Sequence, residues 1–234
     1  DAGATRLVGA GRRARRYPPE WGRRVIEEIA AREADVVIFS GDATSAALKA
    51  EFDLAREAFA PLRAKWGERF VAIPGNHDRY TRRAARERLF ERRLIGSEPS
   101  YPFALDLADG VGLVAIDASI PRPLTSRGLA TPAQIREIGD RLRAQRARTP
   151  FVVVVGHYPV CYPMRFRAAW QHRLTGREAL LAALEDAGAG LYLHGHCHER
   201  WLTGLPVAGA GGGLICANAG SAGLKSRHPS KAAG

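Results

Sequence analysis

The feature that most constrains this fold is a repeated pattern: a short apolar run ends, a glycine follows, and a polar side chain able to bind metal comes next. Four apolar runs rich in Val and Ile stand out, with two weaker ones after them: Val36–Ser40, Phe70–Ile73, Val111–Ile116 and Phe151–Val155, then Leu191–Leu193 and Leu214–Cys216. Runs of this length and composition, bounded by turn residues, are typical of buried β-strands. The chain is therefore expected to build a sheet from them.

Helical patterns lie between most of these runs, and a turn precedes the run at Val111–Ile116. The helices are expected over Pro19–Arg32, Ala46–Trp66, Thr81–Leu94, Pro132–Arg148 and Thr175–Ala187. Thr131 before Pro132 is a typical N-cap, and Thr175 with Glu178 three residues later reads as a capping box. Asp109-Gly110 predicts a hairpin between Phe103–Leu107 and Val111–Ile116. Alternating strands and helices with one hairpin predict an α/β domain with a mixed sheet.

The chain is basic, with a formal net charge of +11 over 234 residues. Lysine occurs only at positions 49, 65, 225 and 231, so nearly all of this charge is arginine. The arginines of 82–93 and 136–148 are interleaved with acidic residues, as on solvated helix faces. A nucleic-acid partner is possible on charge alone but is not favoured.

Cysteine number and hydropathy bear on location and domain organisation. Cys161, Cys197 and Cys216 are an odd set without paired spacing, which argues against a disulfide framework and favours a reducing, cytoplasmic setting. No apolar run is long enough to cross a bilayer. We expect residues 1–234 to form a single domain, with irregular ends over 1–16 and 224–234.

Polar side chains follow four of the predicted strands. Asp42 follows Gly41, Asn76 and His77 follow Pro74-Gly75, His157 follows Gly156, and His196 and His198 follow Leu191–Leu193. Sites in α/β sheets form at the carboxyl ends of strands, so these side chains are expected to meet. Residues two apart in an extended segment point the same way, which directs both imidazoles of the last pair to one place. Imidazole, carboxylate and amide ligands together suit Mn, Fe or Zn.

These motifs resemble those of the calcineurin-like metallophosphoesterases, and of their bacterial single-domain phosphodiesterase type. The matching segments occur in the family's order: Gly41-Asp42, Gly75-Asn76-His77-Asp78, Gly156-His157, Gly195-His196-Cys197-His198 and Asn218-Ala219-Gly220-Ser221. The resemblance implies a four-layer α/β/β/α sandwich of two mixed sheets. It also implies two bound metal ions and hydrolysis of a phosphate ester, expected to be a phosphodiester of a small phosphorylated substrate, by a metal-activated hydroxide.

The resemblance assigns a role to each candidate residue. Asp42 would bridge two metals; Asn76, His157 and His196 would complete the second metal site, and His198 would bind the first. His77 would protonate the leaving oxygen. Asp78 is expected to bind nearby backbone, and His194 to lie behind the ligands. No substrate-binding residue is singled out, although the loop after His157 carries Arg165, Arg167 and His172.

One family motif has no counterpart before Gly41. The family's D-x-H, which supplies an Asp and a His to the first metal, is not found there. We expect that motif and the first strand of one sheet to lie upstream of this sequence. Two alternatives stay open: a nuclease of the same fold, and a catalytically impaired binding module that lacks the first metal site.

Overall fold

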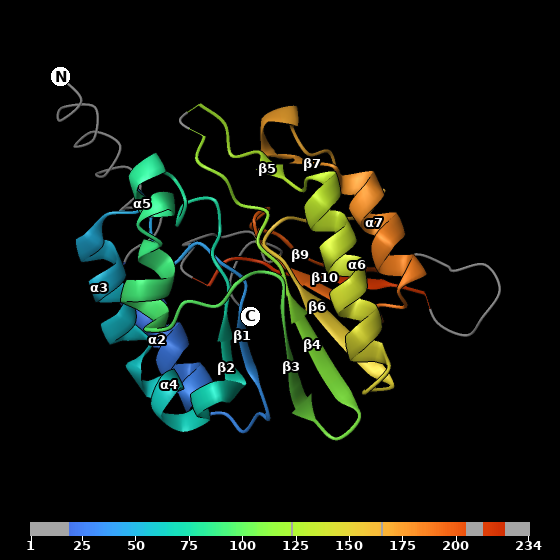
Figure 1. Ribbon diagram of the computed structural model, residues 1–234. Coiled ribbons are helices and arrows are strands. Elements are labelled where there is room, and N and C mark those ends of the chain that lie inside the picture. Colours follow the sequence, from blue (N-terminus) through green and yellow to red (C-terminus); the bar gives the residue numbers. More distant parts are fainter. Residues whose placement is uncertain (1–18, 123, 165, 205–212, 223–234) are drawn as a thin grey trace.

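The computed structural model describes residues 19–122, 124–164, 166–204 and 213–222 (Figure 1). Its main sheet has six strands in the order β3-β4-β6-β8-β10-β9. The bounds are β3 (Phe103–Ala108), β4 (Val111–Ala115), β6 (Phe151–Val155), β8 (Leu191–His194), β9 (Arg200–Gly204) and β10 (Ile215–Ala219). The four inner strands are parallel, and the edge strands β3 and β9 are antiparallel to their neighbours. The predicted α/β class with a mixed sheet and a β3–β4 hairpin is confirmed.

Two smaller sheets complete the strand pairing. β1 (Val37–Phe39) pairs in parallel with β2 (Phe70–Ala72), and β5 (Gly128–Leu129) pairs in parallel with β7 (Leu174–Thr175). β9 was not predicted, because Arg200–Gly204 is a mostly polar edge strand with only Trp201 buried. Within the described residues, the β1–β2 sheet has two parallel strands, so a second mixed sheet stays a prediction.

Helices lie on both outer sides of the strands (Figure 1). Beside β1 and β2 lie α2 (Pro19–Ala30), α3 (Lys49–Ala58), α4 (Ala60–Trp66) and α5 (Arg82–Arg86), while α6 (Pro132–Arg146) and α7 (Arg177–Asp186) cover the main sheet. Strand alternation divides the core accordingly. Val114 of β4 belongs to the cluster under α6 and α7, whereas Leu113 packs with Val71 and Ile73 on the opposite face. The β1–β2 sheet therefore packs against this second face of the main sheet, and the ends of β2, β4 and β6 share one apolar cluster.

Two helix predictions need correction. The helix expected over Ala46–Trp66 is two helices, α3 and α4, because Pro61 in the first turn of α4 has no N–H to continue the hydrogen-bond ladder of α3. The helix expected over Thr81–Leu94 divides into α5 and a π-helix, Phe90–Ile95, with Arg88 between them at φ 49°.

Capping was predicted correctly at one helix and wrongly at another. Thr131 caps α6: its hydroxyl accepts from Gln134 N at 3.2 Å, and the Gln134 side chain accepts from Thr131 N at 3.0 Å. Thr175 does not cap α7. It belongs to strand β7, and Gly176 at φ 82° makes the turn into the helix instead. The strand pairing with Leu129 outweighs the local capping preference.

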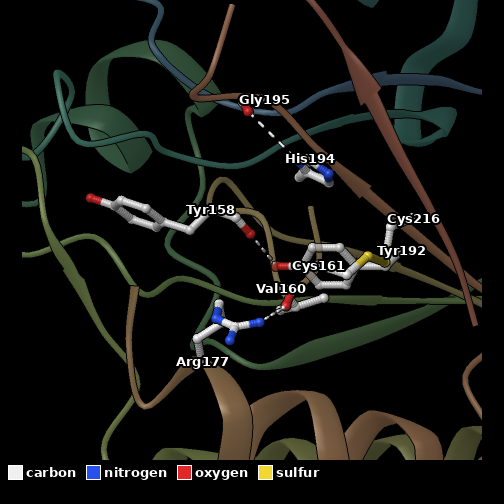
Figure 2. Close-up of a disulfide and its surroundings, with 8 residues drawn as sticks. All are labelled: Tyr158, Val160, Cys161, Arg177, Tyr192, His194, Gly195 and Cys216. Atoms are coloured by element: carbon white, nitrogen blue, oxygen red, sulfur yellow. Dashed lines mark hydrogen bonds between the residues drawn. A yellow bond between two sulfur atoms is a disulfide. The ribbon is translucent and has the colours of Figure 1, made fainter. Parts of the chain in front are cut away.

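Cys161 and Cys216 form a disulfide across 55 residues of sequence (Figure 2). The expectation that no disulfide forms is wrong. The loop after β6 returns over β10 and brings the two Cα atoms to 6.6 Å, a proximity that residue spacing does not reveal. The cysteine argument for a reducing compartment therefore fails. Cys197 keeps a free thiol, whose pKa burial raises to about 12.

Two sequence expectations remain outside this description. The irregular ends over 1–16 and 224–234, and any upstream partner of the first metal site, lie outside the described residues. Of the helices that the structure describes, none has the length and apolar character needed to cross a membrane.

Candidate metal centre

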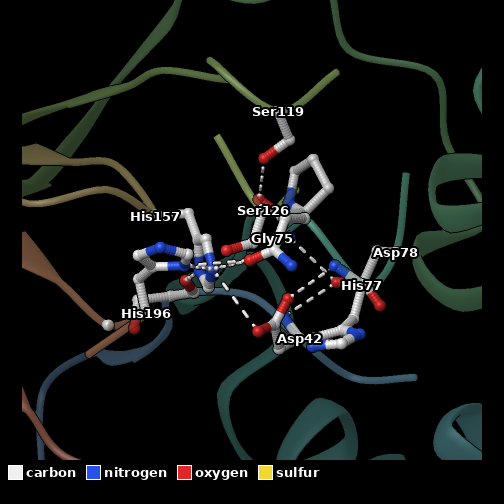
Figure 3. Close-up of polar contacts among 12 residues, drawn as sticks. Asp42, Gly75, His77, Asp78, Ser119, Ser126, His157 and His196 are labelled. Atoms are coloured by element: carbon white, nitrogen blue, oxygen red, sulfur yellow. Dashed lines mark hydrogen bonds and ion pairs between the residues drawn. The ribbon is translucent and has the colours of Figure 1, made fainter. Parts of the chain in front are cut away.

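Four of the predicted ligands meet where strands β1, β2, β6 and β8 end (Figure 3). Asn76 Oδ1 lies 3.1 Å from His157 Nε2 and 2.9 Å from His196 Nδ1. The two imidazoles approach to 3.2 Å between His157 Nε2 and His196 Nδ1. Asp42 Oδ2 lies 3.4 Å from His157 Nε2. Four side chains from four strand ends thus point their ligand atoms at one place, as the sequence pattern predicted.

Hydrogen bonds behind the imidazoles decide which nitrogens face this centre. His157 Nδ1 donates to the Ser40 carbonyl at 2.7 Å, and His196 Nε2 donates to the His172 carbonyl at 2.9 Å. A carbonyl oxygen accepts only, so these nitrogens carry the hydrogens. The other nitrogen of each neutral ring then points a lone pair at the centre. There it meets the Asn76 and Asp42 oxygens, which are acceptors as well.

A group of converging acceptors is held together by a cation. Carboxylate, amide oxygen and two imidazoles, each oriented by an outer hydrogen bond, are a donor set that suits a transition metal or zinc. Within the part of the chain that the structure describes, no three His, Cys, Asp or Glu side chains alone form such a group. The Asn76 amide oxygen lies close to both imidazoles, and with it the residues present fit a metal ion.

Backbone strain gathers at the same residues. Five non-glycine residues in the described chain have positive φ, and three of them are candidate ligands: Asp42 at 68°, His196 at 67° and His198 at 55°. A left-handed backbone is unfavourable for residues with a Cβ, and such strain concentrates at functional sites. His198 and His77 line the same cavity, of about 1600 Å³, as the other candidates.

Two glycines permit the close approach of the strand ends. A Cβ on Gly75 would lie 2.1 Å from Asp42 Oδ1, and a Cβ on Gly41 would lie 2.6 Å from Gly75 N and 2.7 Å from His157 Nδ1. Gly41 also has φ 104°, which favours glycine. Gly195 is less constrained, because a Cβ there would meet its nearest atom, Ser40 Oγ, at 3.1 Å.

The charge of Asp42 is stabilised by its neighbours. Burial by itself raises the pKa of this carboxyl, but the nearby His157 and His77 hold the pKa well below its usual range. The His77 backbone N–H donates to Asp42 Oδ1 at 2.9 Å. Burial lowers the pKa of His157, and the neighbouring Asp42 outweighs it, so the pKa of His157 is raised. The negative charge of Asp42 therefore favours a positive charge beside it, such as a proton on His157.

His77 is held by its own contacts beside the centre. Its Nδ1 donates to the Ser45 carbonyl at 3.0 Å, and its ring stacks on Tyr80 with centroids 6.1 Å apart. The Thr44 hydroxyl donates to the His77 carbonyl at 3.2 Å. The Ser45 carbonyl and the Tyr80 ring thus fix the orientation of the imidazole.

Asp78 is an organising residue, as the sequence suggested. Its carboxylate accepts from the backbone N–H groups of Asp42, Thr44 and Gly75 at 2.9 Å each, and from Ala43 N at 3.2 Å. Burial and the neighbouring Asp42 charge raise the pKa of Asp78 to about 6. One side chain therefore joins the loop that carries Asp42 to the loop that carries Asn76.

Arg79 continues this support, and sequence reasoning missed it. Its guanidinium donates to Glu91 Oε2 at 2.9 Å and to Asp117 Oδ2 at 2.9 and 3.2 Å, and Glu91 is fully buried. Asp117 also accepts from Ser119 N at 2.8 Å, so its role is to bind Arg79 and a turn. The signal available was an Arg directly after the Asn-His-Asp motif, but its partners lie 12 and 38 residues away.

The last motif supports the turn that carries His196. Asn218 is buried, and its amide donates to the Gly195 carbonyl at 2.9 Å while its oxygen accepts from Gly220 N at 2.9 Å. His194 lies behind the ligands, between the rings of Tyr192 and Trp201. Burial lowers the pKa of His194 to about 3, so this ring is neutral.

An α/β layered fold with metal-type ligands at its strand ends defines a class of metal-dependent hydrolases, and the comparison with family models is more specific. The model of the calcineurin-like phosphoesterases matches residues 23–200. That segment covers most of the chain, so this protein belongs to the calcineurin-like phosphoesterase family, as its motifs indicated. No curated protein matches the chain.

Solved structures share the fold. A dimetal phosphatase from Danio rerio is similar with a TM-score of 0.62 and 16% identity, over 88% of this chain and 79% of that one. The purple acid phosphatase PPD1 from yellow lupin (Lupinus luteus) is similar with a TM-score of 0.62 and 16% identity, over 89% of this chain. The match spans 40% of the lupin protein. At this identity the likeness establishes the fold alone.

Proposed function

We propose that this protein is a metal-dependent phosphoesterase that hydrolyses a phosphodiester. The observation that carries the proposal is the convergence of Asp42, Asn76, His157 and His196 with their acceptor atoms 2.9–3.4 Å apart. Membership of the phosphoesterase family supports the reaction class. The choice of a diester over a monoester is the finer part of the proposal.

Each residue has a task that its position supports. Asp42, Asn76, His157 and His196 bind one metal ion, and Asp42 with His198 contributes to a second. When bound, two such ions supply Lewis-acid polarisation of the phosphoryl group and a hydroxide nucleophile at neutral pH. The Ser40 and His172 carbonyls bind the outer nitrogens of His157 and His196, so that His157 Nε2 and His196 Nδ1 face the centre.

His77 is the residue that delivers a proton to the leaving oxygen. It lines the cavity beside the ligands, and its Nδ1 bond to Ser45 O orients the ring. Protonating the leaving group is a task that histidine performs near neutral pH. The stacked Tyr80 ring restricts the imidazole further.

Hydrolysis of bis-p-nitrophenyl phosphate by the protein loaded with Mn²⁺, Zn²⁺ or iron tests the proposal, together with metal content. We expect metal-dependent release of p-nitrophenol and faster turnover of the diester than of p-nitrophenyl phosphate. Single-stranded DNA and RNA oligonucleotides serve as a third substrate class, because a nuclease would cleave them with a steep salt dependence. A metal-loaded protein that hydrolyses none of these would contradict the proposal and favour a binding module.

A further inference from the structure

Part of the cavity lining comes from segments that carry no candidate ligand. We call Arg122, Thr125, Ser126 and His172 the loop wall; all four line the cavity. Ser126 N donates to the Gln171 carbonyl at 3.0 Å, and the Ser126 hydroxyl is bonded to His172 Nδ1. The His172 carbonyl in turn accepts from His196 Nε2 at 2.9 Å. The loop wall is thus joined by one hydrogen bond to a candidate ligand.

The loop wall presents buried donors that lack acceptors. Arg122 Nε and Thr125 Oγ1 are buried and have no hydrogen-bond partner among the described residues. Arginine can only donate, and leaving a buried donor unsatisfied is costly. The guanidinium of Arg79, by contrast, donates to two carboxylates, those of Glu91 and Asp117. A ligand rich in acceptor oxygens would satisfy the loop wall, and phosphate geometry suits a guanidinium in particular.

Tyr158 connects this region to the metal centre. Its ring lies 4.6 Å from the His196 ring, and it fits there because Gly128 has no Cβ, which would lie 2.6 Å from the ring. The Tyr158 ring therefore lies beside both His196 and Gly128, and Gly128 is two residues after Ser126 of the loop wall.

We propose that Arg122 and Thr125 form an anion subsite beside the metal centre, and that the substrate is a phosphoester carrying a second anionic phosphate next to the reacting one. The inference rests on the proposed function, because the metal centre takes the reacting phosphate. Arg122 lies in the segment between β4 and β5 and lines the same cavity as the ligands, so we place it against the neighbouring phosphate. Arg167 lines the same cavity and adds to its positive potential.

Calorimetric titration of the metal-loaded protein, free of excess metal, with inorganic phosphate and with inorganic pyrophosphate tests the subsite. We expect pyrophosphate to bind more tightly than phosphate. Arg122→Met should raise the Kd of pyrophosphate by at least about tenfold, because a charge-assisted bond to phosphate is lost. The Kd of inorganic phosphate should change much less. Arg122→Lys should lie between the two, and Thr125→Val should weaken pyrophosphate alone.

Arg143→Met is the matched control, since it removes an equal charge from an exposed site on α6 and should change neither Kd. Arg122→Lys also carries the test if Arg122→Met does not fold. Equal changes for both ligands, or no change for either, would overturn the subsite. Failure of the proposed function reads differently: the wild-type protein would release no p-nitrophenol from the diester with any metal, whatever the calorimetry shows.

Discussion

The cavity lining has two parts that differ in chemistry and in support: the strand ends that carry the candidate ligands, and the loop wall. At the strand ends, the side-chain oxygens of Asp42 and Asn76 lie beside His157 Nε2, and a cation would satisfy them. In the loop wall, Arg122 Nε and Thr125 Oγ1 are buried without a partner among the described residues, and an anion would satisfy them. Polar groups of these two kinds on one cavity lining are what the proposed ligand, an anion bound through a metal, would require.

The walls also differ in how they are supported. Behind the strand ends, Asp78 accepts four backbone N–H groups and Arg79 binds two carboxylates. The loop wall depends on the contacts of Ser126 and on the short β5–β7 pair, with the Cys161–Cys216 disulfide tying the loop after His157 to β10. Rigid support suits fixed ligand geometry, and a less supported wall suits substrate recognition.

The largest effect is expected from Asp42→Asn. Asparagine tolerates the left-handed backbone at φ 68° and can still accept from His77 N, so the change removes mainly the negative charge. Metal affinity should fall by more than the roughly 10–100-fold that outer-shell partners contribute, and metal-dependent hydrolysis should disappear. Metal titration checks this, with Asp106→Asn on β3 as control. Unchanged metal binding would remove Asp42 from the centre.

Arg79→Met should destabilise the fold by about 3–5 kcal/mol, because it leaves the Glu91 and Asp117 carboxylates buried without their cation. Urea unfolding measures the change. Arg143→Met, whose ion pairs are exposed, should cost less than about 1 kcal/mol. A similar small cost for both variants would mean that the buried network does not support the Asn76 loop.

Gly75→Ala should cost about 1–3 kcal/mol of stability, because its Cβ would lie 2.6 Å from the Asp42 backbone nitrogen and the strand ends must separate. Gly22→Ala has open space around it in α2 and should instead gain about 0.5–1 kcal/mol. The opposite signs can be read from thermal unfolding of the two variants. A neutral Gly75→Ala would show that the close approach is not required.

The smallest effect is expected in the loop wall. Ser126→Ala removes the hydroxyl bonded to His172 and should lower the free energy of unfolding by no more than about 1.5 kcal/mol. Hydrogen exchange of the Ser126 amide, which is bonded to Gln171 O, should become faster while that of β6 stays slow. Equal acceleration in both regions would contradict the difference in support between the walls.

The sequence alone indicated the family and predicted the candidate ligands. Gly41-Asp42, Asn76-His77, His157 and His196 each follow a buried strand, and parallel strands end at one edge, so local pattern and topology together predict that they meet. It also determined the α/β class and the Thr131 cap, because strand periodicity and capping act over a few residues.

Only the tertiary structure decided what surrounds those ligands. The Ser40 carbonyl that sets the His157 tautomer is 117 residues from it, Asp117 is 38 residues from Arg79, and Cys216 is 55 residues from Cys161. Such partners share no local pattern, since any buried carbonyl, carboxylate or thiol at the right distance would serve. Thr175 shows the converse: the local sequence predicts an N-cap, but Thr175 pairs with Leu129 in a strand instead. Contacts between distant segments lose conformational entropy, and burial offsets that loss. Which distant groups meet can therefore be read only from the packed structure.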